Sequence, residues 1–282
     1  MSRWRLLAAT SLAMIAFAGN SLLCRLALKQ TQIDAATFTS IRLVSGAVML
    51  WIIVYARDRT LTIKGSVPSA LALFAYAVCF SFAYVQLSAA TGALLLFGSV
   101  QATMIGYGVR NGERLRALSV AGVAAAFAGF VLLILPGVAA PPLLGTALMI
   151  TAGIAWGIYS LRGRKIAGDP TRVTAGNFLL CVPMAIVLSL CALPWLSIDG
   201  PGIFYAMASG ALTSGVGYAI WYAALPGLQA TQAAIVQLSV PPIAAAGGVL
   251  LLGETMTMRL AIAALAILGG IALVIAEKSR AA

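Results

Sequence analysis

The sequence predicts an all-α polytopic membrane protein whose ten transmembrane helices form two inverted five-helix repeats. Three observations lead to this prediction: an apolar composition, long tracts without charge, and an internal repeat with an odd number of spans. Of the 282 residues, 62% are hydrophobic and only 9% are charged, whereas a soluble domain carries about 25% charged residues. Water would solvate such a surface poorly, and lipid would solvate it well.

Three tracts hold no charged residue at all, namely 65–109, 117–161 and 200–253. Because a membrane-spanning helix needs roughly 20 apolar residues, each tract is long enough for two spans joined by a tight turn. These runs do not alternate between apolar and polar residues, which is typical of helices in lipid and argues against a transmembrane β-barrel.

Turn-forming residues divide the tracts into ten spans. Proline and glycine interrupt the apolar runs at Pro136-Gly137, Pro141-Pro142 and Pro226-Gly227, as expected of turns. We therefore expect spans at residues 5–24, 35–56, 67–87, 90–109, 117–135, 143–162, 174–194, 202–223, 230–252 and 258–276.

The first span also has features of a secretory signal peptide. Arg3 and Arg5 precede an apolar run that contains Ala16-Phe17-Ala18, a pattern seen before cleavage sites. We interpret it as a span because the run continues to Cys24 and because its removal would leave nine spans.

Lys and Arg are distributed unevenly over the two sides that ten spans define. If the N-terminus is cytoplasmic, 14 of the 18 basic residues lie inside, Arg25, Lys29 and Arg259 lie outside, and Arg42 lies within a span. An excess of Lys and Arg marks the cytoplasmic side. We therefore expect a bacterial inner-membrane protein with both termini in the cytoplasm. The net charge of +11 then reflects orientation, and we expect no nucleic-acid partner.

The second half of the chain repeats the first with an offset of 141 residues. Gly112-Glu113 corresponds to Gly253-Glu254, and Gly129 corresponds to Gly270. Since each repeat has five spans, residues 138–282 would enter the membrane from the side opposite to residues 1–137. Inverted repeats are the usual architecture of secondary transporters, with a binding site near the midplane.

With these features the chain resembles the drug/metabolite transporter superfamily, in its EamA-type branch. The resemblance rests on the turns Asn111-Gly112-Glu113-Arg114 and Leu252-Gly253-Glu254-Thr255, on Trp156-Gly157 and on Arg42. The family usually has a proline near the middle of the fourth and ninth spans; here the ninth has Pro241-Pro242 and the fourth has Gln101. The resemblance implies a cavity between the third, fourth, eighth and ninth spans, with the first and sixth closing it.

The candidate substrate-binding residues are mainly the aromatic and amide residues of these spans. They are Tyr76, Phe80, Phe97, Ser99, Gln101, Trp156, Tyr159, Trp221, Tyr222 and Gln237, together with Pro241 and Pro242, which would break the ninth span and free backbone carbonyls. Tyr218 is a further aromatic residue of the eighth span. The alternative for the rings is packing or lipid contact. An amide in hydrocarbon is costly without a partner, but it can also join helices, so both interpretations of the two glutamines stay open.

Four residues are expected to have gating or structural roles: Arg42, Tyr84, Gly253 and Glu254. Tyr84 continues the stripe that Tyr76 and Phe80 form at a spacing of four residues. A charged residue inside a span is by default a functional candidate. The alternative for Arg42, which we favour on the sequence, is a bond to backbone or to Asp34 that closes the outer vestibule.

The charges within the spans restrict the substrate. No Asp or Glu lies deep in a span, whereas an exporter of organic cations would need a buried carboxylate. The profile favours a neutral or zwitterionic substrate held by ring stacking and hydrogen bonds. Within the superfamily it resembles the aromatic amino acid exporters, which implies efflux of phenylalanine, tyrosine and tryptophan analogues. The alternatives are an exporter of other substrates, such as the organic cation methyl viologen, and a membrane-embedded enzyme.

Catalytic residues, cofactors and metal ions are not expected. The chain has no histidine, the commonest metal ligand and acid–base catalyst. Its four cysteines (Cys24, Cys79, Cys181 and Cys191) lie in spans without the spacing of a metal site or a disulfide framework. The expected partners are a small molecule, an amino acid above all, and the lipid bilayer, with the chain acting as a monomer.

The charge bias makes the topology testable. Single cysteines at Ala139 and Asp199 should react with an impermeant thiol reagent from the periplasm, and those at Leu61 and Glu113 should not. The opposite labelling pattern would overturn the predicted orientation.

Overall fold

The computed structural model describes residues 3–59, 64–112, 115–135, 140–163, 168–228, 233 and 236–281, and its regular secondary structure there is helical. In chain order the helices that cross the bundle are α1 (Arg3–Gln30), α2 (Ala35–Asp58), α3 (Val67–Tyr84), α4 (Ala89–Arg110), α5 (Ala117–Ile134), α6 (Leu143–Gly163), α7 (Pro170–Cys191), the continuous α8 (Gly200–Ala208), η2 (Ser209–Val216) and α9 (Gly217–Ala224), then α11 (Val240–Leu252) and α12 (Met258–Ala281). Short 3₁₀ turns, η1 (Leu193–Trp195) and η3 (Leu225–Gly227), follow α7 and α9.

Within these described ranges, nine helical segments are long and apolar enough to cross a membrane, and α11 is a shorter apolar helix. The predicted fold class, a polytopic all-helical membrane protein, is confirmed. Most boundaries agree with the predicted spans to within a few residues, because composition alone decides which segments lipid can solvate.

Side chains that the sequence places just before the apolar runs begin several of these helices. The Asp34 carboxylate accepts hydrogen bonds from the backbone N–H groups of Ala36 and Thr37 at the start of α2. Ser66, Ser88, Asp169 and Asp199 cap α3, α4, α7 and α8 in the same way. The acidic residues at span ends thus satisfy amides that have no acceptor within the helix.

The ninth span differs from the single helix expected at 230–252. A turn at Leu238 and Ser239 precedes α11, and Pro241 and Pro242 lie in the first turn of that helix. First-turn N–H groups have no acceptor within the helix, so proline there removes no hydrogen bond and frees no carbonyl. The interruption lies before the two prolines and not at them, which corrects the expectation.

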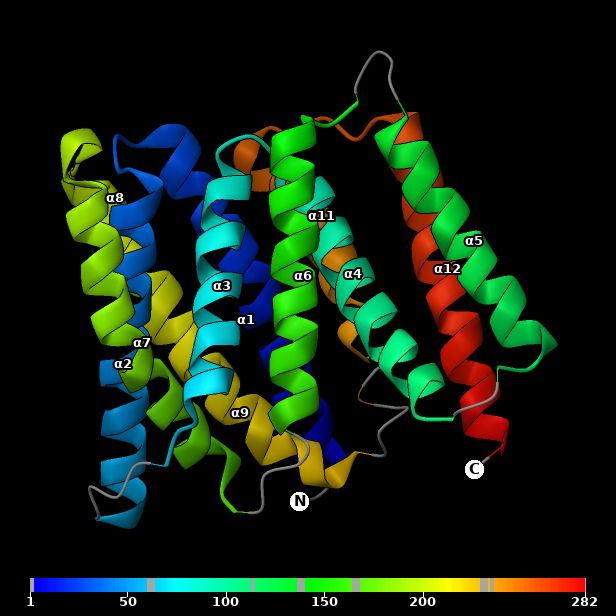
Figure 1. Ribbon diagram of the computed structural model, residues 1–282, viewed down its shortest axis with the longest axis horizontal. Coiled ribbons are helices and arrows are strands. Elements are labelled where there is room, and N and C mark those ends of the chain that lie inside the picture. Colours follow the sequence, from blue (N-terminus) through cyan, green and yellow to red (C-terminus); the bar gives the residue numbers. More distant parts are fainter. Residues whose placement is uncertain are drawn as a thin grey trace.

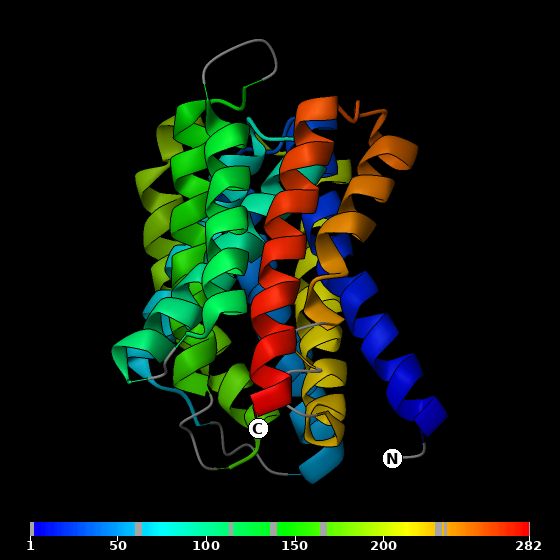
Figure 2. The ribbon, with the colours of Figure 1, turned by 90° about the vertical axis from the view of Figure 1, so that its right-hand side faces the viewer.

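We call α1 to α5 the first set of helices, and α6, α7, the continuous α8–η2–α9, α11 and α12 the second set. The two sets begin at opposite ends of the bundle. Figure 1 shows both termini at one end of the bundle, which we call the terminal face, and the end of α5 and the start of α6 at the other end, which we call the opposite face. Helix α1 begins at the terminal face and α6 at the opposite face, so the second set enters the bundle inverted. Figure 2 shows the same arrangement from the side of α12.

The packing of α5 on α12 has the symmetry expected of inverted repeats. A Cβ atom on Gly122 would lie 2.5 Å from the carbonyl oxygen of Gly270, and one on Gly129 would lie 3.0 Å from that of Ala263. The offset of 141 residues carries Gly122 to Ala263 and Gly129 to Gly270, so it exchanges these two contacts. Close approach of helix backbones at small residues is the usual way that membrane helices pack.

Parts of the sequence predictions fall outside the described residues. Glu113 and Arg114 of the repeat lie there, as do the labelling positions Leu61 and Ala139 and the boundary between residues 137 and 138. The division into units 1–137 and 138–282 therefore stays a prediction.

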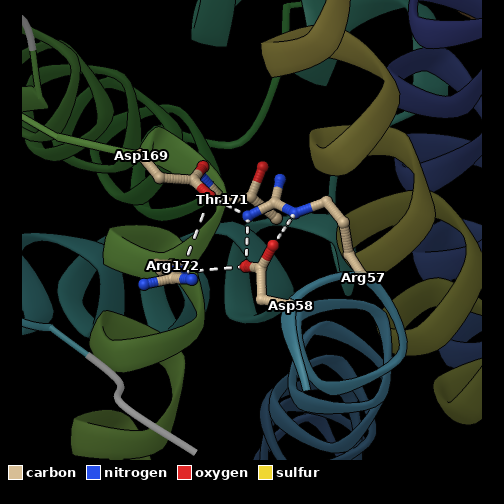
Figure 3. Close-up of polar contacts among 5 residues, drawn as sticks. All are labelled: Arg57, Asp58, Asp169, Thr171 and Arg172. Atoms are coloured by element: carbon tan, nitrogen blue, oxygen red, sulfur yellow. Dashed lines mark hydrogen bonds and ion pairs between the residues drawn. The ribbon is translucent and has the colours of Figure 1, made fainter. Parts of the chain in front are cut away.

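At the terminal face an ion-pair cluster joins α2 to α7 (Figure 3). The Asp58 carboxylate accepts from Arg57 Nη2 at 2.8 Å and from Arg172 Nε at 2.9 Å, and Arg57 also pairs with Asp169. These side chains are partly exposed, so solvent screens the pairs and each contributes little to stability. The cluster nevertheless links a helix of the first set to a helix of the second.

Substituting the small residues between α5 and α12 tests this packing. In Gly270→Ala the new methyl group would overlap the Gly122 carbonyl oxygen, whereas at the neighbouring Gly269 nothing lies within 4 Å of the added Cβ. We expect Gly270→Ala to lower the free energy of unfolding by about 1–3 kcal/mol, and Gly269→Ala to be neutral or slightly stabilising. Thermal unfolding of the two variants in detergent measures the difference; equal melting temperatures would contradict the packing described.

Candidate functional site

A small cavity lies near mid-depth of the bundle, among the spans that the resemblance implied. Its lining comes from α1, α3, α4, α6, η2, α9 and the turn before α11, and consists of Phe17, Asn20, Ser21, Tyr76, Phe80, Leu96, Phe97, Trp156, Thr213, Ser214, Tyr218 and Gln237. The free space, about 20 Å³ for the centre of a water-sized sphere, suffices for about one water molecule. Side chains have therefore closed over the site, and any metabolite needs them to move apart.

Trp156 is the centre of the aromatic side chains around this cavity. Its ring centroid lies 4.9 Å from that of Tyr76 and 5.3 Å from that of Tyr218, and Tyr76 continues to Phe80 at 5.3 Å. The interplanar angle of 25° between Trp156 and Tyr218 marks a stacked pair. A continuous ring surface thus joins helices of the two sets, and such contacts contribute about 0.5–1.5 kcal/mol each beyond area burial.

Asn20 organises the polar side of the cavity. Its Nδ2 donates to the Tyr76 hydroxyl at 3.2 Å. Its Oδ1 accepts from the Ser209 hydroxyl at 2.7 Å and from the Thr213 hydroxyl at 3.3 Å. An amide at this depth must find partners inside the protein, and Asn20 finds them on α3 and η2, so it fixes these elements around α1.

The segment η2 is a π-helix of eight residues between α8 and α9. π-helical turns are rare and occur frequently at functional sites. Gly210 of this segment has no room for a Cβ atom, since one would overlap the backbone of Arg42 and the hydroxyl of Ser45 on α2. The small residues of SGALTSGV let η2 lie directly on α2 and bring Thr213 and Ser214 to the cavity.

Glu254 closes the opposite face together with Arg25. Glu254 Oε1 accepts from Arg25 Nε at 3.1 Å, and Oε2 accepts from the Ala89 N–H at the start of α4 at 2.8 Å. Arg25 Nη1 donates to the carbonyl oxygens of Tyr84 and Val85 at the end of α3. We call these groups the Arg25–Glu254 latch, which joins α1, α3 and α4 to the turn after α11.

Local backbone geometry positions the latch. Gly253 ends α11 in the left-handed region with φ of 63°, which a residue without Cβ adopts freely, and the Glu254 N–H then donates back to the Gly248 carbonyl. Tyr84 lies beneath the latch, with its ring 4.8 Å from that of Phe80 and its hydroxyl 3.4 Å from the Ala89 carbonyl. Tyr84, Gly253 and Glu254 therefore all lie at the Arg25–Glu254 latch.

A second group of polar contacts lies between the cavity and the terminal face. Tyr159 stacks on Trp156 at 5.3 Å and accepts a hydrogen bond of 3.3 Å from Asn177 Nδ2. Asn177 Oδ1 in turn accepts from the backbone N–H of Ser66. These contacts join α6, α7 and the start of α3, so the path towards the terminal face is closed as well.

The candidate residues from the sequence divide into three groups. Five line the cavity: Tyr76, Phe80, Phe97, Trp156 and Gln237. Tyr159 and Tyr222 line a second small cavity towards the terminal face, and the ring of Trp221 makes a T-shaped contact with that of Phe17. The remaining four, among the described residues, lie away from the cavity: Ser99, Gln101, Pro241 and Pro242.

Contacts or grooves elsewhere in the bundle account for three of these four residues. Ser99 lies against Gly153 of α6, where an added Cβ would be 2.5 Å from the serine Cβ. Pro241 and Pro242 line an apolar groove between α4, α11 and α12. Gln101 is buried on α4 one turn beyond Phe97.

Several lining residues were not candidates from the sequence. Phe17, Asn20, Ser21, Leu96, Thr213 and Ser214 were not singled out, and Tyr218 only as one aromatic residue among others. One signal was present, because Asn20 is the only amide in the predicted span 5–24. Ser21, Thr213 and Ser214 carry no such signal, since small hydroxyl residues are common at helix contacts in membranes.

The four cysteines are free thiols, and among the described residues no cluster of three or more cysteine or carboxylate side chains could hold a metal ion.

Comparison with known proteins gives a consistent family. Residues 143–276 match the sequence model of the EamA-like transporter family. An uncharacterized protein of Pseudomonas aeruginosa is 55% identical over 275 residues, which cover 97% of this chain and 96% of that protein. An uncharacterized transporter of Archaeoglobus fulgidus is 27% identical, with 95% and 96% covered.

A solved crystal structure resembles this chain with a TM-score of 0.66 at 20% sequence identity, covering 95% of this chain and 98% of the other. At that identity the likeness concerns the fold alone. The two relatives are uncharacterized, so their names indicate no substrate.

The Arg25–Glu254 latch predicts a change in accessibility. Cys24, fully buried one residue before Arg25, serves as the reporter once the other three cysteines are replaced by alanine. Glu254→Gln leaves the Arg25 charge without its counter-charge, so the opposite face should open more often and Cys24 should react faster with a thiol reagent. The rate should rise about tenfold for each ~1.4 kcal/mol of latch free energy lost.

Asp58→Asn is the matched control for this experiment, because it removes ion pairs at the terminal face and should not accelerate labelling of Cys24. Equal rates in Glu254→Gln and the parent would show that the latch does not hold the opposite face closed.

Proposed function

The chain belongs to the EamA-like transporter family, and we propose that it is a secondary transporter exporting amino acids, preferentially aromatic ones, and related neutral or zwitterionic metabolites by alternating access. The observation that carries this proposal is the aromatic cavity near mid-depth, closed towards both faces by contacts between helices of the two sets. As a member of this family, the protein is a multi-pass membrane transporter of a small molecule.

The lining favours aromatic substrates. Tyr76, Phe80, Phe97, Trp156 and Tyr218 face the cavity together with the polar groups of Asn20, Ser214 and Gln237. Ligand sites are typically apolar surfaces with a few polar groups that fix orientation. A flat ring inserted between Trp156 and its neighbours would replace existing ring contacts with equivalent ones, so opening the site for an aromatic substrate costs less than opening it for an aliphatic one.

Alternating access fits the two closures. In this proposal the Arg25–Glu254 latch opens towards the periplasm, and the contacts of Tyr159, Asn177 and Ser66 open towards the cytoplasm, in turn. The terminal face is then cytoplasmic, in line with the excess of Lys and Arg on that side. The closed cavity corresponds to the state between the two openings.

The rival functions lack support from the lining. Among the described residues around the cavity none is acidic, whereas a cation such as methyl viologen needs a counter-charge in low dielectric. The carboxylate of Glu254, which belongs to the Arg25–Glu254 latch, is already paired with Arg25. A membrane-embedded enzyme would need general acids, bases or nucleophiles at the cavity, and its described lining offers hydroxyl and amide groups without a base beside them.

Replacing Trp156 tests the proposal. Trp156 makes three ring contacts, so in proteoliposomes Trp156→Ala should reduce uptake of labelled phenylalanine about tenfold, equivalent to ~1.4 kcal/mol, and should affect threonine much less. Trp195→Ala is the matched control, because Trp195 is 74% exposed on η1.

Three results would contradict the proposal: equal loss for phenylalanine and threonine, no effect of Trp156→Ala, or transport by the parent protein of methyl viologen in preference to both amino acids.

A further inference from the structure

Arg42 is a buried cation with two nitrogen atoms, Nε and Nη1, that lack hydrogen-bond partners. It lies on α2, two turns from the opposite face, with 1% of its surface exposed. Its Nε and Nη1 atoms are fully buried and donate no hydrogen bond within the described residues. Buried charges are normally paired and hydrogen-bonded, because desolvation penalises them strongly.

The carboxylate expected to pair with Arg42 is engaged elsewhere. Asp34 caps α2 and also accepts from the Ser197 backbone N–H at 3.1 Å. Glu254 is held by Arg25 and the Ala89 N–H. Among the described residues, therefore, no carboxylate forms an ion pair with Arg42, which corrects the expectation of a bond to Asp34.

Two aromatic rings offset only part of this deficit. The guanidinium carbon lies 5.2 Å from the ring centroid of Tyr76 and 4.8 Å from that of Phe80. Cation–π contacts stabilise the charge, but a ring face accepts no in-plane hydrogen bond from Nε or Nη1. Tyr76 and Phe80 also line the cavity, so the guanidinium and the cavity contact the same two rings.

A second buried polar group without a hydrogen-bond partner is found in the lining of this cavity. Ser214 Oγ is buried without a hydrogen-bond partner and belongs to the lining. It comes from η2, the π-helix that Gly210 lets pack on the backbone of Arg42. Unsatisfied polar atoms at this depth are costly in the empty site, and an anionic ligand could satisfy them.

We propose that Arg42 binds the carboxylate of the transported substrate once the Tyr76 and Phe80 rings move apart, with the Ser214 hydroxyl as a second donor. This inference rests on the proposed function and specifies its substrate class, namely molecules with one carboxylate beside an apolar, ring-like body. A guanidinium presents Nη2 side by side with either Nε or Nη1, and a carboxylate matches such a pair with two parallel hydrogen bonds. On either edge one of the two bonds would come from an Arg42 atom that has no partner in the empty site. The displaced rings then stack on the substrate.

A single guanidinium suits a single negative charge. A phosphate ester carries about two charges and would need further cations, whereas the described lining of the cavity contains none. The same charge disfavours organic cations. An amino acid with an uncharged side chain offers one carboxylate for Arg42, and its ammonium group can bind the Gln237 amide oxygen at the cavity.

Paired ligands test this assignment on the purified full-length protein in detergent. Isothermal titration measures phenylalanine against phenylalaninamide, which keeps the ring and the amine and lacks the carboxylate, and leucine against leucinamide. The parent protein should bind each acid at least about tenfold more tightly than its amide, as expected for a lost charge-assisted hydrogen bond. In Arg42→Gln this preference should fall to about twofold or less, with affinity for the amides retained.

Two further variants keep the test decisive if Arg42→Gln does not fold. Arg42→Lys keeps the charge without the paired donors and should show an intermediate preference. Ser214→Ala should weaken binding of the acids more than binding of the amides. Arg259→Gln is the matched control, because Arg259 binds the Leu132 carbonyl at the opposite face and should leave the preference unchanged.

The outcomes separate this inference from the proposed function. Acids that bind in an Arg42-dependent way without any gain from a ring support the inference and contradict the aromatic preference. Acids and amides that bind the parent equally, or an acid preference that persists in folded Arg42→Gln, overturn the inference, whatever the ring preference is.

Discussion

The exclusion of water from the middle of the bilayer is the constraint on which the rest of this structure depends. Backbone groups there must be satisfied within helices, and side-chain polar groups must find partners in the protein. Asn20 meets this requirement completely, through Tyr76, Ser209 and Thr213. Arg42 and Ser214 do not meet it, and they lie beside and in the lining of the aromatic cavity at mid-depth. Thr146 Oγ1 on α6 also lacks a partner, so unpartnered atoms indicate a binding site only together with the cavity.

The inverted arrangement explains why the cavity lies between two closures. Helices of both sets supply its lining, and contacts between the sets lie on each side of it: Arg25 with Glu254 at the opposite face, and Asn177 with the Ser66 N–H towards the terminal face. The α5–α12 pair packs backbone to backbone at Gly122 and Gly270, which suits a rigid support. The Arg25–Glu254 and Asn177–Ser66 contacts on either side of the cavity depend on side chains, which separate at lower cost than packed backbones.

Much of the fold was predictable from the sequence, and less of the site. The spans follow from local composition, and the correspondence between the α5 and α12 segments follows from the offset of 141 residues. Tyr76, Phe80 and Trp156 were predictable as site candidates because large rings at helical spacing stand out. Ser99 and Pro241 were poor candidates for a related reason: spacing along one helix does not say which neighbouring helix its face meets, and these residues face α6 and an apolar groove.

The sequence by itself determined that the chain is a bundle of membrane-spanning helices, because twenty apolar residues have only one way to satisfy their backbone in lipid. Only the tertiary structure decided which polar groups are satisfied. Whether Asn20 finds a tyrosine, whether Asp34 reaches Arg42 or the Ser197 amide, and whether η2 winds as a π-helix all depend on atoms brought together from distant helices. Hydrogen bonding is decided over about 3 Å, a distance that no periodicity in the sequence encodes.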